Sequence, residues 1–133
     1  MIQDCTMTEE LLKSARLALQ NSYSPYSKFQ VGAAIRTNDG TIFTGTNIEN
    51  VSYGLAMCAE RVAIFSAIAK GYRSFTELAI ASSSRNPTFP CGACRQVLAE
   101  FSPEMNIYVD GDTRQSFKLF DLLPNAFKKK DID

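Results

Sequence analysis

Histidine is absent from this chain of 133 residues. That absence excludes a Ser-His or Cys-His nucleophile pair, and it excludes any metal site built on imidazole ligands. Long apolar runs are missing too, since nothing approaches the ~18 apolar residues of a membrane span. Residues 1–14 are polar and acidic, with no apolar run of signal-peptide length. We therefore expect a soluble, cytoplasmic protein with no membrane partner.

An excess of positive charge is also lacking, because 14 Lys and Arg are balanced by 14 Asp and Glu. Proteins that bind nucleic acid usually carry a basic excess or stripe, since neutralising phosphates supplies much of their affinity. The basic run Lys128-Lys129-Lys130 is followed by Asp131 and Asp133, which is typical of a solvated tail. The sequence therefore predicts no nucleic-acid partner. Its length predicts one domain over residues 1–133.

The pattern of apolar residues predicts an α/β protein. Helices are expected at residues 8–21, 58–70 and 91–101, and strands at 29–36, 41–44, 78–81, 106–110 and 116–119. The first two strands form a hairpin around the turn signal Asn38-Asp39-Gly40. Strand–helix–strand order in the second half favours right-handed parallel crossovers and a sheet between helices. Both cysteine motifs then fall at helix N-termini.

Three of the four cysteines carry the main functional signal: Cys58, Cys91 and Cys94. In a reducing compartment cysteines point to metal binding or catalysis rather than to disulfides. Cys91 and Cys94 are three residues apart on one helix, so they can share a metal. Cys58 completes the triad from another helix. Three protein ligands leave one position of a zinc ion free for water, as in catalytic zinc sites.

A carboxylate accompanies these cysteines, since Glu60 is two residues from Cys58. There it can take a proton from zinc-bound water, pass it to a ring nitrogen and later protonate the leaving amine. The alternative is an acid that complements the dipole of a helix N-terminus. Three thiolates leave the zinc site with net negative charge, so we expect Arg61 or Arg95 to donate hydrogen bonds to the sulfurs. Surface arginines that flank the motif by chance are the alternative.

Two motifs together resemble the cytidine deaminase family: Cys58-Ala59-Glu60-Arg61 and Pro90-Cys91-Gly92-Ala93-Cys94-Arg95-Gln96. The resemblance covers nearly the whole chain and includes residues 24–34, 47–50, 122–124 and 126–127. The all-cysteine ligand set and the short chain resemble the small homotetrameric branch, whereas the longer dimeric branch uses histidine as its first ligand. The resemblance implies a three-layer α/β/α fold with a mixed central sheet. It also implies one Zn²⁺ per subunit and active sites shared within a homotetramer.

The same resemblance implies a small-molecule nucleoside substrate. The expected reaction is hydrolytic deamination of cytidine and 2′-deoxycytidine, a step of pyrimidine salvage. By position, Phe29 would pack on the pyrimidine, while Asn47 and Glu49 would bind ribose hydroxyls. The Ala59 backbone would contact the base edge, and Phe127 would reach a neighbouring subunit's site.

Weaker expectations concern aromatic residues. Tyr53 lies in the loop of the ribose-binding segment and is expected to line the pocket. Phe29 and Phe127 have simpler alternatives, as a core strand residue and a C-terminal packing residue. Phe89, before Pro90, departs from the family pattern, where a smaller residue is common.

Four alternatives remain open from the residues. Cys5 as a fourth ligand would give a closed structural zinc module. The Cys91-Gly92-Ala93-Cys94 spacing also fits a thiol–disulfide oxidoreductase, although Cys58 and Glu60 are then unexplained. A nucleic-acid-editing deaminase would share the chemistry, but the balanced charge argues for a free nucleoside. An aminonucleoside-antibiotic deaminase could share the zinc site, and the segment 47–50 favours cytidine over it.

Overall fold

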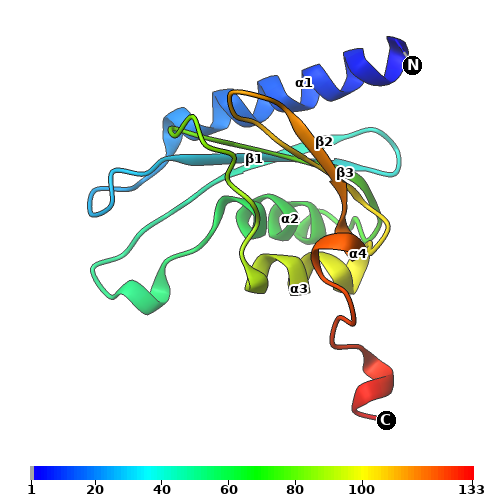
Figure 1. The fold of residues 1–133 in the computed structure, drawn as a ribbon. Helices are drawn as coiled ribbons and strands as arrows, with labels where there is room; N and C mark the ends of the chain where they lie inside the picture. Colours follow the sequence, from blue (N-terminus) through cyan, green and yellow to red (C-terminus); the bar gives the residue numbers. More distant parts are fainter. Residues whose placement is uncertain (1) are drawn as a thin grey trace.

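A computed structural model describes residues 2–133, with side chains from Thr6 onward (Figure 1). Helices and strands alternate along the chain. In order they are α1 (Ile2–Ala18), β1 (Val31–Thr37), β2 (Ile42–Thr46), α2 (Ala59–Ala69), β3 (Phe75–Ser82), α3 (Gly92–Phe101), β4 (Asn106–Val109), β5 (Gln115–Lys118) and α4 (Leu119–Leu122). Short 3-10 turns cover Leu19–Asn21, Tyr53–Leu55 and Lys129–Asp131. No helix within residues 2–133 is both long and apolar enough to cross a bilayer.

The five strands form one mixed sheet in the order β2-β1-β3-β4-β5. β1 runs antiparallel to both β2 and β3, while β3 and β4 are parallel and β5 returns antiparallel to β4. The parallel pair is joined through α3, as the strand–helix–strand order predicts. The expected mixed sheet is therefore confirmed.

Helices cover both faces of this sheet, which gives three layers (Figure 1). On one face α1 buries Leu11, Leu12 and Ala15 against the small residues Ala34 and Ala79. On the other face α2 and α3 pack over the larger strand residues, with a core that includes Ile35, Ala63, Ile64, Leu78, Ile80, Leu98 and Ile107. Successive residues of β1 and β3 alternate between these two cores because strand side chains point to opposite faces. The predicted α/β/α layering is confirmed.

Two glycines let the helices approach the sheet closely. A Cβ on Gly32 would lie 2.1 Å from the carbonyl oxygen of Ala15 in α1. A Cβ on Gly45 would lie 2.4 Å from the carbonyl oxygen of Ala59 and 2.5 Å from the nitrogen of Ala63. Both spaces are too small for any side chain, so only glycine fits. Gly45 thereby seats the first turn of α2 directly on β2.

Several element boundaries differ from the sequence prediction, and β1 begins at Val31 rather than at residue 29. α1 begins at Ile2 rather than at residue 8, and β3 begins at Phe75 rather than at residue 78. The start of β3 is masked in the sequence by Thr76 and Glu77, which are polar yet lie within the strand. The short helix α4, Leu119–Leu122, was not expected, although its buried Leu119 fits a C-terminal anchor.

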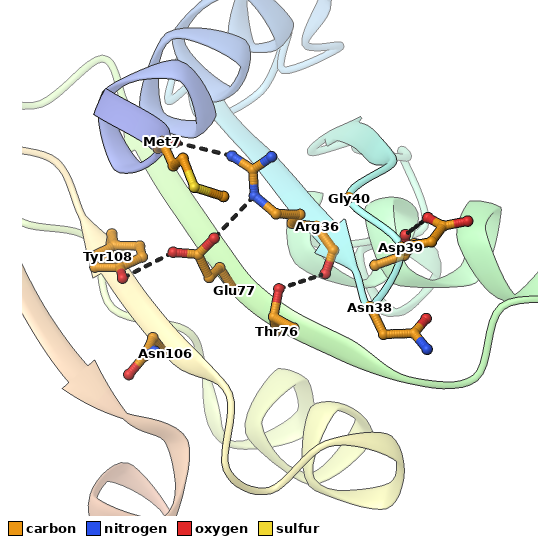
Figure 2. A pocket seen from close by; sticks show the side chains of 10 residues that line it. Met7, Arg36, Asn38, Asp39, Gly40, Thr76, Glu77, Asn106 and Tyr108 are labelled. Atoms are coloured by element: carbon orange, nitrogen blue, oxygen red, sulfur yellow. Dashed lines mark hydrogen bonds and ion pairs between the residues drawn. The ribbon is translucent and has the colours of Figure 1, made fainter. Parts of the chain in front are cut away.

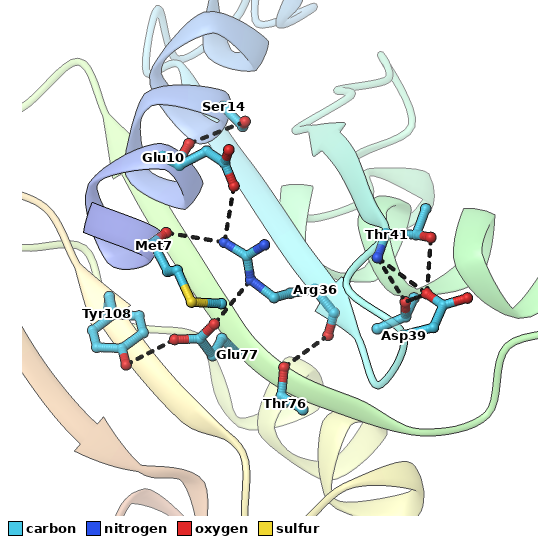
Figure 3. A network of polar contacts seen from close by, with 10 residues as sticks. Met7, Glu10, Ser14, Arg36, Asp39, Thr41, Thr76, Glu77 and Tyr108 are labelled. Atoms are coloured by element: carbon cyan, nitrogen blue, oxygen red, sulfur yellow. Dashed lines mark hydrogen bonds and ion pairs between the residues drawn. The ribbon is translucent and has the colours of Figure 1, made fainter. Parts of the chain in front are cut away.

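A buried ion pair ties α1 to the sheet at the end where β1 finishes and β3 begins (Figures 2 and 3). Arg36 is only 6% exposed, and its Nε donates to Glu77 Oε1 at 2.9 Å. Its Nη2 donates to the Met7 carbonyl at 2.9 Å and to Glu10 Oε1 at 3.3 Å. The Tyr108 hydroxyl donates to the second Glu77 oxygen at 3.0 Å. The network borders a cavity of about 570 Å³ and explains why polar Glu77 belongs to a buried strand.

We expect Arg36→Met to destabilise the protein by about 3–5 kcal/mol, because it leaves the Glu77 carboxylate buried without its partner. Urea unfolding at fixed protein concentration measures the loss. The double variant Arg36→Met/Glu77→Gln removes the uncompensated charge and should recover much of it. Glu10→Ala, which removes the exposed arm, should cost less than about 1 kcal/mol. A loss for Arg36→Met as small as that of Glu10→Ala would contradict this account.

Candidate active site

Three cysteine sulfurs converge where two helices begin. Cys58 is the N-terminal capping residue of α2, Cys91 caps α3, and Cys94 lies in the first turn of α3. Cys58 Sγ lies 3.8 Å from Cys91 Sγ, which is 3.5 Å from Cys94 Sγ. All three sulfurs lie within 4.8 Å of one another. The structure therefore brings together the three cysteines that the sequence selects.

These separations fit one zinc ion. A Zn–S bond of about 2.3 Å in a tetrahedral site places two sulfurs roughly 3.8 Å apart. Within the part of the chain that the structure describes, the cluster holds these three residues, so one tetrahedral position is left for a non-protein ligand. The Cys5 side chain, proposed above as an alternative fourth ligand, lies outside the described residues.

Helix geometry favours negative charge at this point. The first intrahelical bonds near the sulfurs run from Val62 N to Cys58 O at 3.1 Å and from Arg95 N to Cys91 O at 3.0 Å. The amides before them have no acceptor within their own helices, and they form the positive end of each helix dipole. Two such ends meet at the cysteine cluster, which favours thiolates over thiols.

The thiols also influence one another. A hydrogen bond from Cys94, and a second from Arg61, lower the pKa of Cys58 to about 5. The same bond raises the pKa of Cys94, which donates to the Cys58 thiolate and is also buried. These hydrogen bonds favour the thiolate at Cys58. A divalent cation would let the remaining thiols ionise as well.

The two candidate arginines behave differently. Arg61 Nη2 lies 3.5 Å from Cys58 Sγ, and Arg61 Nε is buried with no acceptor among the described residues. Arg95 instead donates from Nε to the Pro90 carbonyl and from Nη1 to the Leu122 carbonyl, both at 2.7 Å. Arg61 thus has the expected sulfur contact. The Arg95 guanidinium instead joins the loop before Cys91 to α4.

Glu60 is the buried acid of the site. It is 4% exposed, in the first turn of α2. Burial raises the pKa of Glu60 to about 7, and the charge on Cys58 contributes in the same direction. A carboxyl group poised near neutral pH can both accept and donate a proton.

Asn47 fixes the backbone of Phe29 and of Val31, where β1 begins. Its Oδ1 accepts the Val31 N–H at 2.9 Å and also accepts a hydrogen bond from Ser22, while its Nδ2 donates to the Phe29 carbonyl at 2.8 Å. One N–H of the Asn47 amide remains for a ligand. Phe29 keeps 36% of its surface exposed, so it is not the fully buried strand residue of the simpler alternative.

Glu49 organises the loop before β1. Its Oε1 accepts the N–H groups of Tyr26 and Ser27 at 3.0 and 3.2 Å, and its Oε2 accepts the Ser27 hydroxyl. These bonds, the one from the Ser27 hydroxyl above all, lower the pKa of Glu49 and keep it ionised. Ser22 and Ser27 donate hydrogen bonds that hold the side chains of Asn47 and Glu49, a role that was not predicted from the sequence. The serine-rich segment 22–27 was the available signal.

A cavity of about 360 Å³ adjoins this loop. Glu49 and Tyr53 line it, and the Tyr26 ring stands edge-on to Tyr53 with centroids 6.1 Å apart. The cysteines are not among the residues that line it. The structure thus brings Glu49 and Tyr53 together in one cavity and places the cysteine cluster outside its walls.

The remaining candidates occupy separate positions. Ala59 is fully buried and is the first residue of α2. Phe127 is 61% exposed and hydrogen-bonded through its backbone to Gln96. Phe89 packs edge-on against Phe117 of β5, with centroids 5.3 Å apart. Phe89, which departs from the family pattern, therefore packs the loop before Cys91 against the edge strand β5.

Comparison with known proteins agrees with this geometry. The family model for the cytidine and deoxycytidylate deaminase zinc-binding region matches residues 5–109. The cytidine deaminase of Sporosarcina psychrophila is 46% identical over 128 residues, covering 93% of each chain. That of Halalkalibacterium halodurans is 45% identical over 127 residues, covering 92% of this chain and 96% of the relative.

Solved structures give the same result. The crystal structure of cytidine deaminase from Burkholderia pseudomallei superposes with a TM-score of 0.86 at 45% identity, covering 90% of this chain and 98% of that one. The Mycobacterium tuberculosis enzyme superposes with a TM-score of 0.81 at 39% identity, covering 91% and 97%. Sequence, fold and the three-sulfur cluster agree: the chain belongs to the zinc-binding cytidine and deoxycytidylate deaminase family.

Proposed function

We propose that this protein converts cytidine, and also 2′-deoxycytidine, to the uridine nucleoside and ammonia, as a step of pyrimidine salvage. The observation that carries the proposal is the meeting of three cysteine sulfurs and a buried carboxyl group at two helix N-termini. Relatives named cytidine deaminase share more than 40% identity over most of this chain.

Cys58, Cys91 and Cys94 would hold one zinc ion, which supplies the Lewis acidity that makes a water molecule nucleophilic at neutral pH. Glu60 accepts a proton from the attacking water and delivers it to ring nitrogen N3, while the water oxygen bonds to C4. Glu60 then transfers the second water proton to the amino group, which leaves as ammonia when the C4–N bond breaks. The pKa of Glu60, about 7, suits a group that must take up and release protons in turn.

The substrate-binding roles follow from the groups that remain free. Phe29 offers an exposed aromatic face to the pyrimidine, and the Ala59 backbone lies at the start of α2 where the base edge would arrive. Asn47 keeps one N–H donor, and the Glu49 carboxylate is an acceptor. A donor beside an acceptor complements the vicinal hydroxyls of ribose. Tyr53 lines the adjoining cavity.

Arg61 offsets the excess negative charge of a three-thiolate site. Its Nη2 contact to Cys58, with a buried Nε that lacks an acceptor, supports a role in stabilising the ligand sulfurs. Less negative charge on the sulfurs leaves the metal a stronger Lewis acid.

We further propose that the protein acts as a cytoplasmic homotetramer with shared active sites. Large apolar side chains are exposed around the candidate substrate pocket and on the C-terminal segment. They include Tyr23, Tyr26, Ile48, Val51, Tyr53, Leu55, Phe120 and Phe127. Exposed apolar groups in such number support burial against other copies of the chain. Thiolate ligands are also best preserved in a reducing compartment.

The first prediction from this proposed function tests the reaction itself. Wild-type protein loaded with zinc should convert cytidine to uridine in a spectrophotometric assay. Glu60→Gln should lower kcat by about 10²–10⁴-fold, because the amide cannot shuttle protons. Zinc content, measured by elemental analysis, should stay at one per subunit. Glu100→Gln, an equivalent change at an exposed position of α3, serves as the control. Absence of turnover by the zinc-loaded wild type would overturn the proposal.

The second prediction concerns zinc affinity. Arg61→Ala should weaken zinc binding by about 10–100-fold, since the Cys58 thiolate loses the hydrogen bond and the positive charge of Arg61. Competition with a chromogenic chelator measures this without reference to turnover. Arg114→Ala, which removes an exposed arginine paired with Glu9, should leave the affinity unchanged. Equal affinities for the two variants would rule out the role given to Arg61.

The third prediction concerns assembly. Light scattering after size exclusion should give four times the chain mass of 14.7 kDa. Mixing inactive Glu60→Gln subunits with Phe127→Ala subunits should restore turnover at low cytidine, where Phe127→Ala alone is impaired, because some sites then combine an intact Glu60 with an intact Phe127 from a neighbour. A monomeric mass, or no recovery after subunit exchange, would count against shared sites.

A further inference from the structure

The C-terminal segment leaves the body of the molecule after α4 (Figure 1). Leu119 anchors its start, being fully buried with its N–H donating to the Met105 carbonyl at 2.9 Å. Beyond Leu123 most residues are exposed. Terminal segments of this kind are poorly ordered unless specific contacts tie them down. The few contacts that hold this segment therefore decide where Phe127 lies.

Gln96 supplies those contacts through both ends of its carboxamide. Its Nε2 donates to the Phe127 carbonyl at 2.8 Å, and its Oε1 accepts the Phe127 N–H at 3.3 Å. One side chain thus satisfies both backbone groups of one residue. Among the described residues, the other hydrogen bonds of residues 124–133 stay within the segment itself.

Arg95, the preceding residue, holds the other end of the same segment. It donates to the Leu122 carbonyl and to the Pro90 carbonyl, both at 2.7 Å. Arg95 and Gln96 directly follow Cys94 on α3. The helical turn that carries a metal ligand therefore also fixes both ends of residues 122–127.

We propose that Gln96 is a positioning residue for substrate binding. By holding the Phe127 backbone it fixes the direction in which the Phe127 ring leaves the subunit, so that the ring enters the nucleoside site of a neighbouring copy. This inference rests on the proposed function, in which Phe127 crosses to that site. The ring is mostly exposed on its own subunit, so its attachment to α3 sets its place.

The kinetic consequence follows from the part that Phe127 plays. A ring that packs against bound nucleoside contributes similarly to ground state and transition state, so its loss affects KM more than kcat. Prior ordering of the ring lowers the entropy cost of binding. Gln96 is a cleaner test than Arg95, because Arg95 also touches the loop that precedes Cys91.

The test compares Gln96→Leu with Gln20→Leu, the same change at an exposed residue. Gln96→Leu removes both hydrogen bonds at similar side-chain size and should raise KM for cytidine about five- to twentyfold. We expect kcat to change by less than about twofold, with zinc content and oligomeric state preserved. Hydrogen exchange should accelerate in residues 122–130. Gln96→Glu keeps the acceptor for the Phe127 N–H and should show an intermediate KM.

A double variant isolates the route through the ring. Gln96→Leu/Phe127→Ala should match Phe127→Ala alone, because Gln96 acts only through Phe127. If the effects of Gln96→Leu and Phe127→Ala on KM were additive in the double variant, the inference would be overturned. It would also be overturned if Phe127→Ala raised KM while Gln96→Leu accelerated hydrogen exchange but left KM unchanged. An unchanged KM in Phe127→Ala would instead refute the cross-subunit role on which the inference rests. If Gln96→Leu does not fold, Gln96→Glu carries the comparison.

Discussion

The concentration of negative charge at three sulfurs within 4.8 Å of one another is the constraint on which the rest of the structure depends. Three thiolates exceed the charge of one zinc ion, so the surroundings must supply positive potential. Two helix N-termini meet at the cluster, and Arg61 contacts Cys58 from the first turn of α2. Glu60 is also negative when ionised, and its burial, together with the Cys58 charge, raises its pKa to about 7.

The fold brings the N-termini of α2 and α3 together. α2 follows β2 and α3 follows β3. Both strands run antiparallel to β1, which lies between them, so they finish at the same end of the sheet. Gly45 lets the first turn of α2 contact β2 without a gap. At the opposite end, the Arg36–Glu77 pair holds α1 and the sheet together. Close packing at Gly45 and the buried Arg36–Glu77 pair thus hold helices against the sheet at both ends of its strands. The end that carries the cysteines is otherwise formed by loops.

The sequence predicted the parts that depend on local pattern. The layers, the mixed sheet and the three-cysteine cluster follow from strand alternation, the two cysteine motifs and the resemblance that they carry. It failed where a residue's role depends on a distant partner. Glu77 looks like a loop residue until Arg36 is placed beside it. Arg95 looks like a partner for the sulfurs, yet it binds Leu122, 27 residues later in the chain. Partnerships between distant residues leave no periodic signal.

The two residues proposed to bind ribose already serve the fold. Asn47 holds the backbone of Phe29 and Val31, and Glu49 holds Tyr26 and Ser27. Because these bonds exist without substrate, the groups are ordered in advance and the entropy cost of binding falls. The Asn47 side chain, which would meet a ribose hydroxyl, also holds the backbone of Phe29. The position of the Phe29 ring therefore depends on the same side chain. The roles proposed for Asn47 and Phe29 would therefore couple recognition of sugar and base through one amide, which favours an intact nucleoside over the free base.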